Sequence, residues 1–202
     1  MDSAQSGDGC MNIDSDNPSE ILKTLDNELS QPVSLVLYGR GSICLGFDRP
    51  QAEHRSTQDI DAILQLGQAE AFDADREFWF AVERTNQLLE PKGLYITHLF
   101  PEDLVFLRPD WAERIVPVLR PETRWLRLYR PHTIDLILTK MMRGEDPQDM
   151  DDVDFLVRHD GITREQMEPA FANVRMPDVV ELHDAFARAL PVVRGILDRH
   201  SG

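Results

Sequence analysis

The chain has 202 residues, and its hydrophobic fraction of 42% and charged fraction of 28% are ordinary for a globular protein. The 36 acidic residues outnumber the 21 basic ones, which gives a net charge of −15. Nucleic-acid binding by a whole protein surface needs an excess of Lys and Arg, so the charge excludes an extended surface of that kind. No apolar run is long enough to span a bilayer, and we expect a cytoplasmic protein without a membrane partner.

The first 17 residues are acidic and rich in Ser and Gly, which predicts a disordered tail at residues 1–17. They have neither the basic start nor the apolar segment of a signal peptide. The two cysteines, Cys10 and Cys44, form no CxxC pair and no zinc-type cluster with His. We interpret both as free thiols in a reducing compartment.

Apolar periodicity and turn residues predict alternating helices and strands in the first two-thirds of the chain. In order, these are a helix at 18–29, a strand at 33–39, a helix start at 41–47, a strand at 57–66, a helix at 69–89, and strands at 93–100 and 124–130. The polar segment 48–56 contains proline and is typical of a loop.

The last third of the chain is predicted to be helical. Its four helices are expected at 132–144, 147–159, 163–174 and 178–200. Strands followed by helices indicate an α/β (α+β) fold. We therefore expect an α/β core at 18–130 and a C-terminal helical region at 131–202 that packs on it.

Two acids, Asp59 and Asp61, alternate with an apolar residue in the second predicted strand. Residues two apart in a strand point to the same side, so both carboxylates share one face. Two ionised carboxylates this close repel each other unless a cation lies between them. Mg²⁺ takes oxygen ligands and bridges to phosphates, so the pair is a candidate metal site. A solvent-exposed strand face that happens to carry two acids is the alternative.

A glycine-rich turn, Gly39-Arg40-Gly41-Ser42, directly follows the first predicted strand. Glycines let backbone N–H groups approach an anion, and a helix N-terminus adds a favourable dipole. The Ser42 hydroxyl can donate to a phosphate oxygen. An ordinary tight turn with a capping serine is the alternative, because neither GxxxxGK[ST] nor GxGxxG is present.

Together, the segments LYGRGS and RSTQDIDAIL resemble the nucleotidyltransferase superfamily that includes DNA polymerase β. The resemblance is to a bacterial branch with the signature R-x-T-x-D-I-D. It implies a mixed-sheet core in which the turn cradles a triphosphate and the two acids bind Mg²⁺, or Mn²⁺. The implied metal ligands are Asp59 and Asp61, and the implied nucleotide-binding residues are Gly39, Gly41, Ser42, Arg55 and Thr57.

A third segment, DLILTKMMRGEDPQDMDDV, is similar to a helix pair of minimal and abortive-infection-type nucleotidyltransferases. Lys140 and Arg143 match the basic positions of that pair, and Asp149 and Asp152 match the acidic ones. The resemblance implies that Lys140 neutralises phosphate charge during catalysis. The two acids lie on one helical face and can orient Lys140 or Arg143. A salt-bridge network between helices without a substrate role is the alternative.

The sequence departs from the superfamily at one position. Active members carry a third carboxylate on a neighbouring strand, where this chain offers Thr97 and His98. The acids Glu102 and Asp103 come just after that strand, and Asp135 opens the later helix, but none of them matches that position. His98 is a candidate general base, although a histidine on an apolar strand is more often a core residue.

The resemblance implies transfer of a nucleoside monophosphate from an NTP to an acceptor hydroxyl. The acceptor stays open between a protein, an RNA end and a small molecule. The alternative is a catalytically impaired member that binds a nucleotide or a partner. A homodimer, or a toxin–antitoxin pair with an antitoxin partner, is a further expectation from the relatives.

Overall fold

The computed structural model describes residues 16–48, 57–65, 68, 71–72 and 74–200. The predicted tail, except for its last two residues, lies outside the described residues. So do most of the predicted loop at 48–56 and the predicted site residue Arg55.

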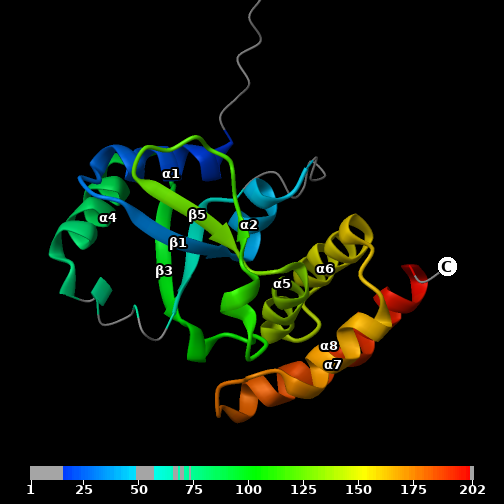
Figure 1. The fold of residues 1–202 in the computed structure, drawn as a ribbon. Helices are drawn as coiled ribbons and strands as arrows, with labels where there is room; N and C mark the ends of the chain where they lie inside the picture. Colours follow the sequence, from blue (N-terminus) through cyan, green and yellow to red (C-terminus); the bar gives the residue numbers. More distant parts are fainter. Residues whose placement is uncertain (1–15, 49–56, 66–67, 69–70, 73, 201–202) are drawn as a thin grey trace, which may run out of the picture.

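The described strands form one five-stranded sheet in the order β3-β2-β1-β5-β4. Strand β1 pairs antiparallel with β2 and parallel with β5, while β3 is parallel to β2 and β4 is antiparallel to β5. The predicted α/β fold with a mixed sheet is therefore confirmed (Figure 1). The strand bounds are β1 Val33–Tyr38, β2 Asp59–Leu64, β3 Tyr95–Pro101, β4 Val116–Pro117 and β5 Leu126–Arg130.

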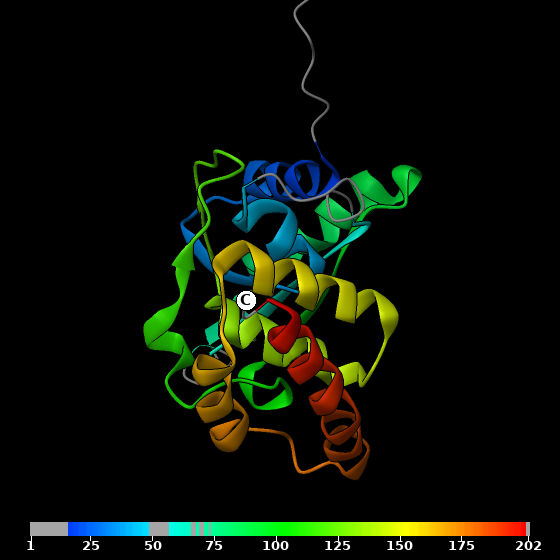
Figure 2. The ribbon, with the colours of Figure 1, turned by 90° about the vertical axis from the view of Figure 1, so that its right-hand side faces the viewer.

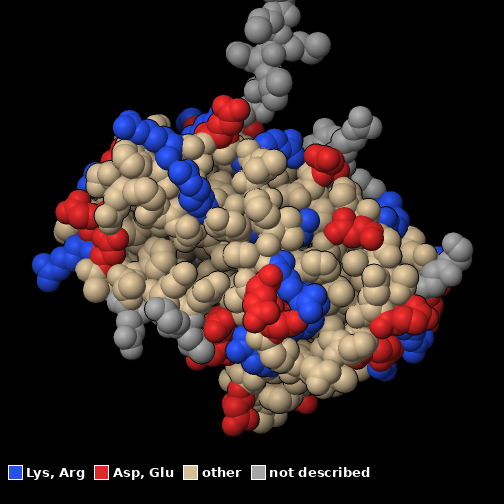
Figure 3. Space-filling view, viewed as in Figure 1, with Lys and Arg blue, Asp and Glu red and all other residues tan. Residues whose placement is uncertain are grey.

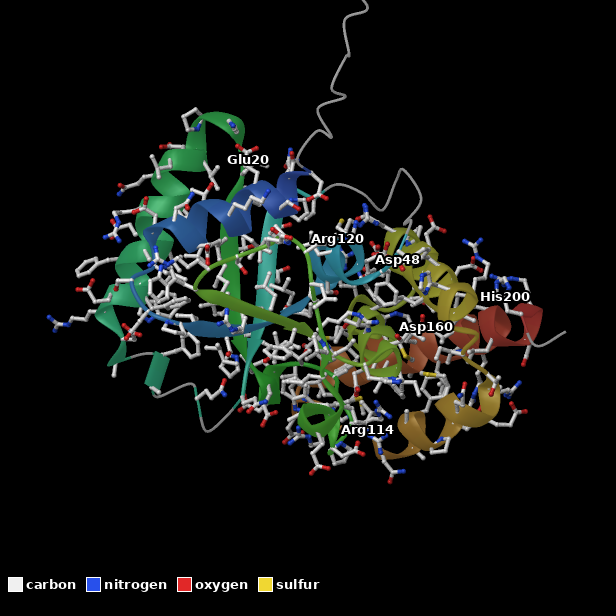
Figure 4. All side chains as sticks on the ribbon, turned by 45° about the horizontal axis from the view of Figure 1, so that its top comes forward. Glu20, Asp48, Arg114, Arg120, Asp160 and His200 are labelled. Carbon is white, nitrogen blue, oxygen red and sulfur yellow. The ribbon has the colours of Figure 1, made fainter. Side chains whose placement is uncertain are left out.

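Two helices, α1 (Asn17–Glu28) and α4 (Arg76–Leu89), cover one face of the sheet and enclose a core with the buried sides of β1, β2 and β5. Glu20 of α1, labelled in Figure 4, forms an ion pair with Lys92 in the 3₁₀ turn that follows α4. The sequence predicted one helix at 69–89, but the backbone leaves helical geometry at Asp75. The Asp75 carboxylate accepts the Phe78 N–H at 3.0 Å, so α4 begins only at Arg76.

A second core lies between α2 (Gly39–Gly46) and the C-terminal helices. Ile43 and Phe47 contribute to it from the α2 side, and Ile137, Leu156 and Val193 from the C-terminal helices. These helices gather on one side of the sheet, which faces the viewer in Figure 2. Their bounds are α5 Thr133–Lys140, α6 Pro147–Asp160, α7 Arg164–Asn173 and α8 Val180–His200, with the 3₁₀ turn η5 at Met141–Arg143.

The segment 120–130 (RPETRWLRLYR) is the densest basic stretch of the sequence, but its arginines do not share one surface. Arg120 is exposed and donates to the Phe47 carbonyl at 3.2 Å beside α2 (Figure 4). Arg130 is buried, with its guanidinium 4.0 Å from the centre of the Phe47 ring. On the face seen in Figure 3, acidic and basic side chains are interspersed. Across the described residues, no helix combines the length and apolarity needed to cross a bilayer.

Strand β3 forms one edge of the sheet, and a side chain covers part of that edge. The Asn86 amide of α4 donates to the Ile96 carbonyl at 3.1 Å and accepts the Ile96 N–H at 2.7 Å. Both backbone groups of Ile96 are thereby satisfied without a further strand.

Candidate functional site

A pocket of about 670 Å³ lies between the sheet and helices α5 and α6. The end of β1 and the start of β2 form one wall, because these antiparallel strands place Tyr38 opposite Asp61. The pocket brings together residues that are more than 100 positions apart in the sequence. Predicted site residues in its lining are Gly39, Thr57, Asp59, Asp61, Lys140, Arg143, Asp149 and Asp152.

The two candidate metal ligands lie side by side in this pocket, as their spacing in the sequence predicted. The Thr57 hydroxyl donates to Asp59 Oδ1 at 2.7 Å. The Thr97 hydroxyl of β3 lies 3.2 Å from Asp59 Oδ2 and 3.1 Å from Asp61 Oδ1. Hydroxyl groups therefore hold both carboxylates in place.

Gly39 is the first residue of α2 and has a positive φ of 64°. A Cβ atom at this position would lie 3.4 Å from Asp61 Oδ2, so the turn approaches the carboxylate pair closely. Gly41 has a different role. A Cβ atom there would lie 2.8 Å from Ile60 Cδ1, so this glycine lets α2 pack against β2 and does not line the pocket.

Ser42 is fully buried, and its hydroxyl donates to the Gly39 carbonyl at 2.8 Å. The sequence predicted that this hydroxyl meets a phosphate. In the structure the hydroxyl is directed at the backbone of the turn, because α2 begins at Gly39 and its first turn places Ser42 toward the core. Ser42 therefore shapes the turn and lies behind the pocket wall.

Replacing Gly39 with alanine should cost about 1–2 kcal/mol of stability, because a side chain disfavours a positive φ. The added methyl group would also narrow the pocket beside Asp61, so if the pocket holds nucleotide with Mg²⁺, as the sequence predicts, Gly39→Ala should weaken stabilisation by that ligand. Gly93→Ala is the matched control, since Gly93 has a φ of 65° and nothing within 4 Å of the added Cβ. Thermal unfolding with and without nucleotide measures both effects. If nucleotide stabilised both variants equally, Gly39 would have no role in nucleotide binding.

The predicted basic and acidic residues of α5 and α6 form one connected network. Lys140 Nζ donates to Asp149 Oδ1 at 3.0 Å and to Asp152 Oδ2 at 2.6 Å, although its side chain is only 8% exposed. Arg143 extends the network by donating to Asp149 Oδ2 at 2.6 Å. The prediction that the two acids orient these cations is consistent with this geometry.

The charges of this network have a measurable consequence for Asp149. Burial acts to raise the pKa of the Asp149 carboxyl. The hydrogen bond from Arg143 and the charge of Lys140 outweigh burial and hold that pKa below its usual range. Asp149 is therefore ionised at neutral pH and keeps Lys140 in place.

Five further residues line the pocket, namely Tyr38, Arg40, Thr139, Met142 and Gln148, and of these the sequence had pointed only to Arg40, as part of the glycine-rich turn. Arg40 donates to Asp152 Oδ1 at 3.0 Å, which ties the turn of α2 to α6. Burial raises the pKa of the Tyr38 phenol, and the charges of Asp61 and Asp59 raise it further. Tyr38 therefore lines the pocket as an uncharged side chain. Its position at the end of β1, directly before Gly39, is the signal in the sequence that could have indicated it.

The other acids considered as a third carboxylate lie away from the pair. Asp135 is fully buried and binds Arg108, whose Nη2 lies 2.7 Å from Asp135 Oδ2. Glu102 accepts hydrogen bonds from Trp111 and Arg175. Among the described residues, no group of three His, Cys, Asp or Glu side chains is placed to hold a metal ion. His98 pairs in register with Asp61, but its side chain is not among those described.

A family model described as "Nucleotidyltransferase of unknown function (DUF6036)" matches residues 19–162. The chain belongs to this family. The match includes β1, β2, α5 and α6, the elements that line the pocket of this nucleotidyltransferase family member. The resemblance inferred from the sequence motifs is therefore confirmed at the level of the family. No curated protein and no solved structure matched the chain.

Proposed function

We propose that this protein transfers a nucleoside monophosphate from an NTP to an acceptor hydroxyl and releases pyrophosphate, with the help of bound Mg²⁺ or Mn²⁺. The observation that carries the proposal is the shared pocket. It joins the Asp59 and Asp61 carboxylates, the turn at Gly39 and the buried ammonium group of Lys140. Family membership supports the reaction class.

The residues present fit a magnesium ion. Mg²⁺ is usually held by one or two carboxylates and completes its coordination with water and substrate phosphates. Asp59 and Asp61 are two such carboxylates, and both face the pocket. When bound, the ion would neutralise phosphate charge and polarise the phosphoryl group that reacts.

The remaining charges of the pocket suit a phosphate chain. Three cationic side chains, Lys140, Arg40 and Arg143, line the pocket, and each is also paired with an acid of α6 or of its N-cap. An ammonium group has three N–H donors, and the contacts with Asp149 and Asp152 use two of them, so the third can reach a phosphate oxygen. In the proposed reaction this cation would stabilise the charge that develops on the leaving pyrophosphate.

The proposed step is an in-line displacement in which positioning supplies most of the rate. The acceptor oxygen bonds to the α-phosphorus, and the bond between that phosphorus and the bridging oxygen of pyrophosphate breaks. The acceptor proton is lost to water. Asp59 and Asp61 would hold the ion, and the Lys140 network would hold the departing phosphates.

A second candidate is a module that binds nucleotide without turnover. It is favoured by one observation, the lack of a three-acid cluster among the described residues. For the acceptor of the transferred group, three classes of molecule stay open as proposals: a protein, an RNA end and a small molecule. A partner in a toxin–antitoxin pair and a cytoplasmic location stay expectations from the sequence.

A thermal-unfolding screen of the four NTPs, with and without Mg²⁺, tests the proposal. We expect at least one NTP to raise the melting temperature only when Mg²⁺ is present, because a ligand that binds the folded state stabilises it. Incorporation of label from that NTP into an acceptor would then separate the enzyme from the binding module. No shift with any NTP would contradict both.

A further inference from the structure

The Thr97 hydroxyl occupies an unusual position between the two carboxylates. Its oxygen lies 3.2 Å from Asp59 Oδ2 and 3.1 Å from Asp61 Oδ1. A hydroxyl has one hydrogen, so it can donate to only one of these two acceptors at a time. The arrangement therefore places three oxygen atoms close together, and the Thr97 hydrogen can serve only one of the two carboxylates at a time.

An irregularity in the sheet brings Thr97 to this place. Ile60 pairs with Ile96 and Asp61 pairs with His98, so Thr97 is an extra residue of β3 between two consecutive pairs. A bulge of this kind redirects a side chain, and bulges are common beside active sites. Here it directs the Thr97 hydroxyl at both carboxylates.

The two distances from the Thr97 oxygen to the carboxylates are close to the spacing between neighbouring ligands of a metal ion. Octahedral Mg²⁺ with ligands at 2.0–2.1 Å places neighbouring oxygens about 2.9 Å apart. The two distances from the Thr97 oxygen exceed this value by only a few tenths of an ångström. Threonine hydroxyls are also established magnesium ligands in phosphate-binding loops.

We propose that Thr97 Oγ1 is the third protein ligand of one divalent cation held by Asp59 and Asp61, an inference that rests on the proposed function. The hydroxyl keeps its proton. When the oxygen faces the cation, the hydrogen turns away from the carboxylates, and the Ile60 carbonyl, 3.5 Å from the Thr97 oxygen, is the other acceptor within reach among the described residues. A neutral oxygen donor thereby takes the place that a third carboxylate would fill.

The first test compares Thr97→Val with Thr97→Ser by Mn²⁺ titration, followed by electron paramagnetic resonance, in the absence of nucleotide. Valine keeps the branched shape and removes the oxygen, whereas serine keeps the oxygen. We expect one Mn²⁺ per wild-type chain and an affinity about 10–100-fold lower in Thr97→Val. The Mn²⁺ affinity of Thr97→Ser should stay within about threefold of the wild-type affinity, since the set of oxygen ligands is unchanged.

The second test separates a ligand from a residue that only positions the carboxylates. In Thr97→Cys, a soft thiolate replaces the hydroxyl, so Cd²⁺ should bind at least about tenfold more tightly than in the wild type. Cys10 could itself bind Cd²⁺, so all variants carry Cys10→Ser. The other cysteine of the sequence, Cys44, is buried. Burial raises the pKa of the Cys44 thiol to about 12, which keeps that thiol from competing for the metal.

The outcomes are distinguishable. A wild type that binds no Mn²⁺ would contradict the metal site of the proposed function and this inference with it. A wild type that binds Mn²⁺, with equal affinity in Thr97→Val, would overturn the role of Thr97 alone. If Thr97→Cys did not bind Cd²⁺ more tightly than the wild type, the side chain of residue 97 would only position Asp59 and Asp61. Thr97 is exposed in the absence of ligand, so these variants should fold, and thermal unfolding checks this.

Discussion

Asp61→Asn should abolish the Mg²⁺-dependent stabilisation by NTP and lower any transfer activity by at least about 100-fold, because it removes a charged metal ligand. The same substitution should leave the metal-free protein at least as stable as the wild type. Asp59 and Asp61 carry like charges side by side, and removing one of them relieves their repulsion. Thermal unfolding with and without Mg²⁺ and NTP measures both parts.

Asp110→Asn is the matched control for Asp61→Asn. Asp110 forms an exposed ion pair with Arg114, and such pairs contribute at most about 1 kcal/mol. This variant should respond to Mg²⁺ and NTP like the wild type. If Asp61→Asn kept the wild-type response, the carboxylate pair would have no role in metal binding, and the two acids would be an ordinary polar strand face.

Lys140→Met should lower the free energy of unfolding by about 3 kcal/mol, because it leaves buried carboxylates without their shared cation. Asp152 is fully buried, and Asp149 is only 3% exposed. Arg40 and Arg143 still contact these acids in the variant, which limits the loss. Urea denaturation measures the difference in free energy of unfolding directly, provided that its dependence on urea concentration has the same slope in both proteins.

Two further variants test whether the loss comes from the buried charges. Lys92→Met removes an equally charged side chain that is 59% exposed, and it should cost less than about 1 kcal/mol. Adding Asp152→Asn to Lys140→Met should restore part of the lost stability, because it neutralises the buried carboxylate. A loss below 1 kcal/mol in Lys140→Met, or no recovery in the double variant, would mean that the network does not hold α5 and α6 together.

Local sequence patterns were sufficient for most elements of the fold. The apolar run at 33–39, closed by glycine, is β1, and the helices at 132–144 and 147–159 appear with small shifts at their ends. The positions of Asp59 and Asp61 followed from strand periodicity alone. Their encounter with Lys140 in one pocket followed from the family resemblance, because no local pattern encodes a contact between such distant residues.

Three features of the site were beyond the reach of local patterns. The orientation of Ser42 depends on the residue at which α2 begins, and the sequence placed that start two residues later. The bulge at Thr97 depends on how β3 pairs with β2. The contact of Arg40 with Asp152 spans 112 residues of sequence, and its existence depends on how α6 docks beside the turn.

The amide of Asn86 has a consequence for how other molecules can approach. A guest strand that extended the sheet beyond β3 would need free backbone groups along that edge, and at Ile96 it would meet an amide that already holds both of them. Ile96 is the neighbour of Thr97, so the closed position lies directly beside the carboxylate pair. A strand from another copy therefore cannot pair with β3 at Ile96 unless the Asn86 amide is displaced.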